Sequence, residues 1–260
     1  MGKKTQVNQM SRLARTQRVQ RKQKVFRWLI IIIMILLGLS GLNWYRNYQY
    51  RQLVNFDQRG VVVSQQNSYV DFISLANIGQ KFVYIRASQG SLYTDDDFAD
   101  NYQRSQGANL KVGVYHSFSF NSSATQQFDN FKSEVRQRIG TLPIAVQINT
   151  NDVALSHEQV KSVHKFVKLI LNTYHRRVLI WTSHGIYQQV RLKHQQTLFC
   201  SISNHLSADQ SGLKTYNANQ ILSNDGQSQA FIQLVFIGDH HQWSKYESPN
   251  LLNNGGTTIE

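Results

Sequence analysis

From Gly60 onward the sequence alternates between short apolar runs and amphipathic segments, and this alternation constrains the fold more than any other feature. The apolar runs are rich in Val, Ile, Phe and Tyr and are bounded by Gly, Asn or Ser, which is typical of β-strands. They predict strands over Gly60–Ser64, Phe82–Ala87, Lys111–Ser117, Pro143–Asn149, Arg177–Thr182, Leu198–Ser203 and Phe231–Phe236. Strands that alternate with helices over about 200 residues predict a parallel α/β fold, most simply a (β/α) TIM-like barrel.

The intervening amphipathic segments predict helices. The clearest covers Ser156–His175, where a Ser is followed three residues later by a Gln, the pattern of a capping box. Apolar residues then recur along one face of this segment, as they do in a helix that packs on a sheet. Two further helices are predicted over Ala124–Ile139 and Asp97–Ala108, and the acids Asp95, Asp96 and Asp97 are interpreted as charges at a helix start.

Charge is distributed unevenly along the chain. The whole sequence carries 28 basic and 15 acidic residues, a formal net charge of +13. The first 27 residues hold nine basic side chains and no acid, whereas residues 60–260 hold 16 basic and 14 acidic ones, a net of +2. The protein is therefore a nearly neutral body with a basic N-terminal arm, and no nucleic-acid partner is expected.

A single cysteine, Cys200, excludes an intramolecular disulfide framework and a multi-cysteine zinc site. The nine histidines show no recognised ligand spacing, so no metal is expected.

Residues 28–45 form an uncharged, strongly apolar stretch directly after the basic arm. Its 18 residues would span about 27 Å as a helix, close to the thickness of a hydrocarbon core. Trp28, Trp44 and Tyr45 resemble interfacial aromatics. The stretch predicts one N-terminal transmembrane helix, an uncleaved signal-anchor, and the alternative is a signal peptide cleaved near Gly38-Leu39-Ser40.

The basic arm sets the predicted orientation. By the positive-inside rule the N-terminus lies in the cytoplasm, with the arm on anionic lipid headgroups of the cell membrane, and the later domain is extracellular. The predicted organisation is a cytoplasmic arm (1–27), an anchor (28–45), a connector (46–59), a barrel domain (60–250) and a tail (251–260).

Several stretches of the barrel domain resemble the family 25 glycoside hydrolases, the CH-type lysozymes. These are Gly60-Val-Val-Val-Ser64, Phe82-Val-Tyr-Ile-Arg-Ala-Ser-Gln-Gly90, Leu110-Lys-Val-Gly-Val-Tyr-His-Ser-Phe118, Leu142-Pro-Ile-Ala-Val-Gln-Ile-Asn149 and Leu179-Ile-Trp-Thr-Ser183. The resemblance implies a modified (β/α) barrel. It also implies hydrolysis of the bond between N-acetylmuramic acid and N-acetylglucosamine in peptidoglycan, with no metal or organic cofactor.

This sequence departs from the family at the positions of the catalytic carboxylates. The resemblance places those positions at Val62, Gln89, Gln147 and Asn149. Glycoside hydrolysis needs paired carboxylates, one to donate a proton and one to stabilise positive charge or assist attack. An amide has no labile proton and no charge, although it still forms hydrogen bonds with a sugar. Alternatively, Gln147 and Asn149 are only polar residues at a strand end.

Two acids are candidate substitutes, Asp152 soon after Asn149 and Asp239 after the last predicted strand. The sequence favours interpreting Asp152 as a turn residue before the cap at Ser156. The candidate substrate-binding residues are Tyr115, His116, Gln147, Asn149 and Trp181. The aromatic rings of Tyr115 and Trp181 either stack on sugars or fill the barrel interior.

Three functions fit these features. The first is a membrane-anchored, extracellular lysozyme-like domain, a pseudoenzyme that binds peptidoglycan glycan strands without efficient cleavage. The second is a divergent but active N-acetylmuramidase of cell-wall turnover that uses Asp152 or Asp239. The third is a scaffold whose barrel no longer binds sugar.

Overall fold

The computed structural model describes residues 27–42, 44, 56–151, 154–192, 196–202, 212–224 and 227–248. The chain divides into two compact units, residues 1–55 and residues 56–260. In the first unit, residues 27–42 and Trp44 are helical and expose their large apolar side chains. None of the helices in the described ranges is long and apolar enough to cross a membrane. Residues 1–26, 43 and 45–55 and the tail, on which parts of the predicted arm, anchor and connector fall, lie outside the description.

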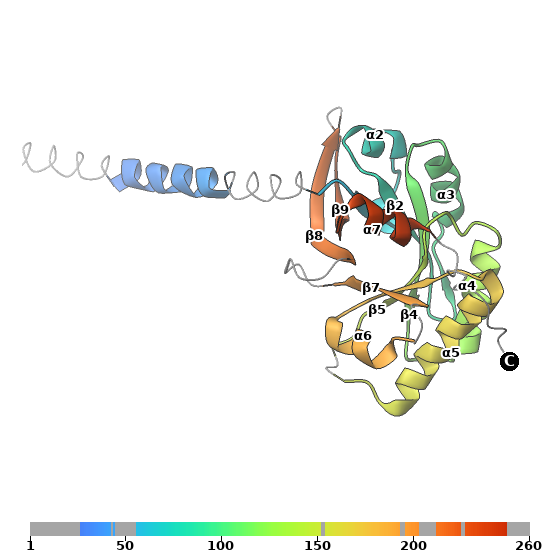
Figure 1. Ribbon diagram of the computed structural model, residues 1–260. Coiled ribbons are helices and arrows are strands. Elements are labelled where there is room, and N and C mark those ends of the chain that lie inside the picture. The colour runs from blue at the N-terminus through green and yellow to red at the C-terminus, as the bar shows by residue number, and fades with distance from the viewer. Residues whose placement is uncertain are drawn as a thin grey trace, which may run out of the picture. The chain divides into compact units, whose positions relative to one another are not determined.

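The second unit is a closed barrel of eight strands (Figure 1). In sheet order these are β1 (Arg59–Val63), β9 (Gln227–Ile237), β8 (Gly212–Asn224), β7 (Thr197–Ser201), β6 (Val178–Thr182), β5 (Ile144–Ile148), β4 (Lys111–Phe118) and β2 (Phe82–Gln89). The barrel closes because β1 pairs with both β9 and β2. The pairings are parallel except for the two that β9 makes, and the short β3 (Tyr93–Thr94) pairs antiparallel with the end of β2.

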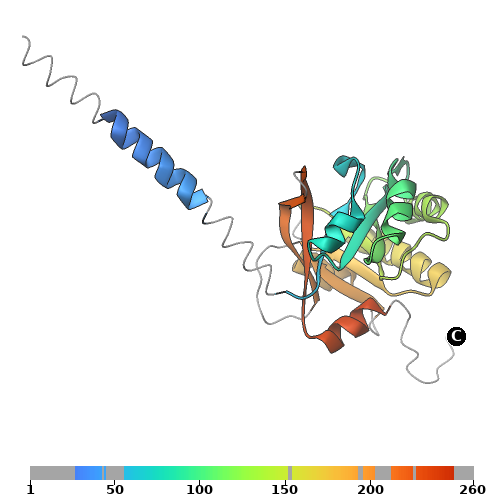
Figure 2. The same ribbon diagram turned by 90° about the horizontal axis from the view of Figure 1, so that it is seen from above.

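Helices surround the barrel, and Figures 1 and 2 show them outside the sheet. They are α2 (Phe72–Asn77), α3 (Phe98–Gln106), α4 (Ala124–Val135), α5 (His157–Tyr174), α6 (His184–Val190) and α7 (His240–Glu247). The capping box predicted for α5 is confirmed, since the Ser156 side chain accepts a hydrogen bond from the Gln159 N–H. Apolar residues of α3, α4 and α5 pack with the outward-facing strand residues in one core cluster.

A second core cluster fills the barrel interior. Helix α7 closes the end at which the parallel strands begin, because Trp243 packs against Phe82 at the start of β2, with ring centroids 5.3 Å apart. Trp243 and Tyr246 also contact Phe236 near the end of β9. With this end of the barrel occupied by rings, only the end where the parallel strands finish is free to form a binding site.

The predicted barrel is confirmed, but two strands of its last third and the position of Asp95 differ from the sequence-based expectation. Strand β8 was not predicted, because polar residues such as Lys214 and Thr215 interrupt its apolar pattern. Strand β9 is longer than the predicted Phe231–Phe236 and runs antiparallel, so it forms a hairpin with β8. The prediction for Asp95 is wrong: Asp97 occupies the N-cap of α3, whereas Asp95 is buried in an ion pair.

The inner surface of β4 requires a glycine at position 113. A Cβ atom there would lie 2.4–2.9 Å from ring atoms of Tyr84. That ring cannot move aside, because it is buried and its hydroxyl contacts the Pro143 carbonyl at 3.2 Å and the Tyr246 hydroxyl at 3.1 Å.

We therefore expect Gly113→Ala to lower the free energy of unfolding by about 1–3 kcal/mol through overpacking. The matched control is Gly107→Ala, since a Cβ atom there meets nothing nearer than the Arg104 carbonyl oxygen at 3.7 Å. Urea unfolding of both variants measures the difference, and equal stabilities would contradict this account.

Candidate functional site

Two cavities lie at the end of the barrel where the parallel strands finish. The first has a volume of about 380 Å³ and the second about 560 Å³. The first is lined by Val62, Ser64, Gln66, Asn67, Arg86, Tyr115, Gln147, Asn219, Ala230, Phe231 and Ile232. The second is lined by Gln66, Arg86, Gln89, Gly90, Ser91, Leu92, Tyr93, Ser119, Asn121 and Ser122. Because they share Gln66 and Arg86, we treat them as one groove.

The four positions that the family resemblance predicts for carboxylates fall in or beside this groove. Val62 is buried in the wall of the first cavity, where Gln147 is half-buried, and Gln89 is exposed in the second. Asn149 lies one residue beyond the end of β5, is exposed, and lines neither cavity. Within the described part of the chain, no carboxylate side chain lines the groove.

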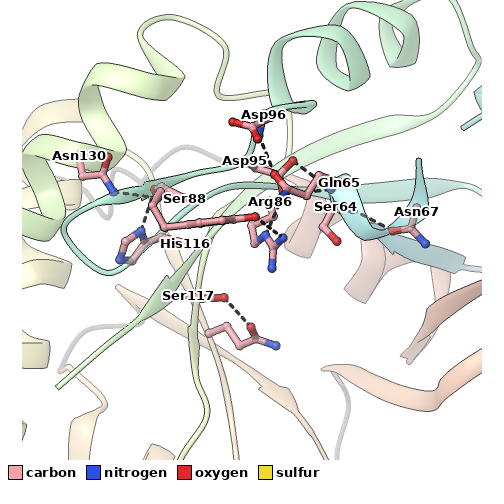
Figure 3. A network of polar contacts seen from close by, with 12 residues as sticks. Ser64, Gln65, Asn67, Arg86, Ser88, Asp95, Asp96, His116, Ser117 and Asn130 are labelled. Atoms are coloured by element: carbon pink, nitrogen blue, oxygen red, sulfur yellow. Dashed lines mark hydrogen bonds and ion pairs between the residues drawn. The ribbon is translucent and has the colours of Figure 1, made fainter. Parts of the chain in front are cut away.

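Strand register orients the Gln147 side chain. Ser117 of β4 is the register partner of Gln147 of β5, and its Oγ donates a hydrogen bond to Gln147 Oε1 at 2.7 Å (Figure 3). With the amide oxygen engaged in this way, the Nε2 group is left to donate into the cavity. Gln147, which the resemblance predicts to stand at an acid position, therefore presents a hydrogen-bond donor.

Arg86 is the single charged residue among the described residues that line the groove. Its Nε donates to Asp95 Oδ2 at 2.8 Å and its Nη2 donates to the Tyr93 hydroxyl at 3.0 Å. The Gln65 N–H also donates to both Asp95 oxygens, at 3.0 and 3.1 Å, and Figure 3 shows Arg86, Asp95 and Gln65 together. Burial raises the pKa of the Asp95 carboxyl, and the hydrogen bonds from Gln65 and Arg86 oppose that rise.

Sequence reasoning missed Arg86 and its partner. The available signal was a cation inside the apolar run Phe82–Ala87, since a charge in a buried strand needs a partner. Asp95 was instead grouped with the two acids that follow it.

Tyr115 and Trp181 contact each other inside the barrel. Their rings contact edge to face with centroids 5.7 Å apart, and Trp181 Nε1 donates to Thr215 Oγ1 at 3.0 Å. Tyr115 reaches the first cavity, whereas Trp181 lines neither. Trp181 therefore belongs to the barrel core, and Tyr115 forms part of the floor of the groove.

His116 was predicted as a substrate-binding residue, but the structure places it away from the groove. It is fully buried between the barrel and the helices, with its ring 4.7 Å from that of Phe166 and 5.9 Å from that of Phe131. Ser88 Oγ lies 2.9 Å from its Nδ1 and Gln127 Oε1 lies 3.2 Å from its Nε2. Burial lowers the pKa of His116 from 6.5 to about 4.

This pKa predicts acid sensitivity. Between pH 6.5 and 4 the unfolded chain binds a proton at His116 that the folded chain does not, so stability is full above pH 6.5 and falls towards pH 4. The expected loss from this group is about 3 kcal/mol. Urea unfolding at several pH values should show a shallower dependence for His116→Gln than for the unaltered protein, and identical curves would contradict the prediction.

Of the two candidate substitute acids, the structure describes Asp239 and not Asp152. Asp239 caps α7, where it accepts a hydrogen bond from the Gln242 N–H at 2.7 Å. Since β9 is antiparallel to β1, the end of β9 lies at the end of the barrel opposite the groove, and Asp239 cannot take part in chemistry there. Asp152 lies outside the described residues.

The closed sheet and its surrounding helices give the second unit the architecture of a modified (β/α) barrel. Residues 61–213 match glycosyl hydrolases family 25, and the chain belongs to this family. It is 28% identical over 115 residues to "Autolytic lysozyme" of Clostridium acetobutylicum, covering 44% of this chain and 35% of that one. It is 37% identical over 76 residues to "Lysozyme M1" of Streptomyces globisporus, covering 29% and 26%. Each match thus spans about a third or less of the relative's length.

Solved structures confirm the fold. A family 25 glycosyl hydrolase from Bacillus anthracis aligns with a TM-score of 0.63 at 22% identity, covering 74% of this chain and 94% of that one. A bacterial lysozyme from Streptomyces coelicolor aligns with a TM-score of 0.58 at 22% identity, covering 73% and 95%.

Proposed function

We propose that the barrel domain binds peptidoglycan glycan strands without cleaving them efficiently. Membership of family 25 and the lysozymes among its relatives support a ligand in the cell wall. The single observation that carries the second half of the proposal is a groove lined, among its described residues, by no carboxylate.

Electrostatics argue against efficient hydrolysis in this groove. The transition state of glycoside hydrolysis resembles an oxocarbenium ion, so it needs negative charge nearby and a carboxylic acid to protonate the leaving oxygen. Here the described lining offers the cation of Arg86, the amide of Gln147 and the alkyl group of Val62. These groups destabilise a cationic transition state or leave it unsupported, whereas the amides and hydroxyls still bind sugar hydroxyls.

The test uses the full-length protein in mild detergent with purified cell-wall sacculi. We expect the protein to sediment with the sacculi while the supernatant contains no released muropeptides. Gln147→Leu, which removes the amide from the first cavity, should weaken sedimentation. Muropeptide release by the unaltered protein would refute the non-cleaving half of the proposal.

The active muramidase is retained as a second candidate because of the position of Asp152. In the sequence it follows the last residue of β5 by four positions, and Gln147 of that strand lines the groove. Release of muropeptides that is lost in Asp152→Ala would support this candidate over the binding domain.

We also propose that residues 28–45 anchor the domain at the outer face of the cell membrane, with the basic arm on cytoplasmic anionic lipid. The support is the sequence: 18 residues without charge, flanked on one side by nine basic residues and no acid. The protein should remain in the membrane pellet after an alkaline carbonate wash. Its mature N-terminus should precede Trp28, and an N-terminus after Ser40 would instead identify a cleaved signal peptide.

A further inference from the structure

We infer that the groove binds an anionic group of the cell-wall polymer, a phosphate or a carboxylate, through Arg86 and Gln147. This inference rests on the proposed function, because it names the chemistry that the same groove recognises. It is carried by the meeting of a partly engaged guanidinium and a free amide donor in a cavity whose described lining holds no carboxylate.

Arg86 uses only some of its hydrogen-bond donors within the protein. A guanidinium has five N–H donors. In the described structure one is used on Asp95 through Nε and one on Tyr93 through Nη2, and Nη1 makes no hydrogen bond to protein. Because the side chain lines both cavities, we infer that its remaining N–H donors are available to a ligand in the groove.

The carboxylate that pairs with Arg86 does not face the groove. Asp95 lies behind the guanidinium with a fully buried side chain, and it lines neither cavity. Both of its oxygens already accept hydrogen bonds, from the Gln65 N–H and from Arg86 Nε. Asp95 therefore fixes the orientation of Arg86 without presenting an acceptor to the groove.

The donors of Arg86 and Gln147 together match an anionic ligand. Gln147 Oε1 accepts from Ser117, so the amide contributes its Nε2 donors to the cavity that Arg86 lines. A planar guanidinium and an amide N–H₂ group that line the same cavity suit the oxygens of a phosphate or carboxylate better than they suit a neutral hydroxyl. In a cell wall such oxygens belong to polyol-phosphate or sugar-phosphate polymers, or to the peptides attached to the glycan.

The experiment measures binding of the full-length protein to three preparations of sacculi. One is untreated, one has its phosphodiester polymers removed with hydrofluoric acid, and one has its carboxyl groups amidated. We expect at least a tenfold loss of affinity with one treated preparation, which identifies the source of the anion. Equal affinity for all three would overturn the inference while leaving glycan binding intact.

Inorganic phosphate provides an independent probe, because it can bind whether or not the glycan does. We expect chemical-shift changes in Arg86 and Gln147 resonances on titration with phosphate. If the protein binds no sacculi but phosphate still perturbs these residues, the proposed function and the cell-wall source of the anion both fail, and only the assignment of Arg86 and Gln147 to an anion site survives. If neither binds, both are overturned.

Two variants test the assignment to residues. Arg86→Gln combined with Asp95→Asn removes both charges while keeping similar shapes, and should abolish the preference for untreated sacculi. Gln147→Glu leaves the ion pair in place and adds a negative charge to the cavity, and it should weaken binding at least tenfold. The matched control is Lys81→Gln, which removes an exposed cation just before β2, at the opposite end of the barrel. Unchanged anion preference in both groove variants, with folding verified by circular dichroism, would refute the assignment.

Discussion

Replacing Gln147 with Asp and Asn149 with Glu in the full-length protein should raise the rate of muropeptide release from sacculi by at least about 10²-fold. The reason is that a single acid/base group contributes ~10²–10⁴ to rate, and amides stand at the two positions that we propose for such groups. Gln147 lines the first cavity from β5, and Asn149 lies two residues further on, just beyond the end of that strand. Release is measured by chromatography of the soluble products.

A control separates chemistry from added charge. Ser91→Glu combined with Asn121→Asp places two acids in the second cavity, away from the end of β5. This variant should remain inactive. If the Gln147 and Asn149 replacements also release nothing, the groove has lost more than its acids. The cation of Arg86 is then the first residue to examine, because it opposes a cationic transition state from within the same cavity.

The sequence allowed most of the barrel to be predicted because its parallel strands are buried on both faces. Such strands appear as continuous apolar runs, and β1, β2, β4, β5 and β6 all have this form. The hairpin of β8 and β9 was harder to identify because its strands mix polar and apolar residues. Helices α2 and α6 were missed because each is under eight residues long and has too few turns for a periodic pattern.

The prediction that both Tyr115 and His116 bind substrate conflicts with the geometry of a β-strand. Tyr115 and His116 are adjacent on β4, so their side chains point to opposite faces of the sheet and cannot both enter the groove. The structure gives the inner face to Tyr115 and the outer face to His116. Alternation alone would have identified this conflict. Alternation does not say which of the two residues faces the barrel interior. That depends on how β4 is oriented in the closed sheet, which is set by the folded structure.

The partner of Arg86 was less accessible to sequence reasoning. Asp95 begins a run of three acids before α3, and all three have the composition of a helix start. Its burial depends on the turn through β3, which returns the chain along β2, and on the Gln65 N–H supplied from the loop after β1. Each contact joins residues from different segments that come together only in the folded barrel, so the local sequence around Asp95 does not reveal them.

The Arg86–Asp95 ion pair should be among the most sensitive points of the domain. Removing one partner of a buried ion pair costs about 3–5 kcal/mol, because the other charge remains buried without compensation. The two single replacements should differ. The Asp95 side chain is 0% exposed and that of Arg86 is 10% exposed, so an orphaned carboxylate is worse solvated than an orphaned guanidinium. Arg86→Met is therefore expected to destabilise the protein more than Asp95→Ala.

Urea unfolding of the two single variants and of the double variant completes a thermodynamic cycle. We expect a favourable coupling energy, so that the double variant is more stable than the sum of the single losses predicts. The Lys111–Glu247 pair is the matched control: its atoms are 3.7 Å apart and its side chains are 53% and 28% exposed. Solvent screening limits such a pair to about 1 kcal/mol or less. If loss of Arg86 costs no more than loss of Lys111, Asp95 does not depend on Arg86 for its burial, and the orientation of the guanidinium in the groove must have another origin.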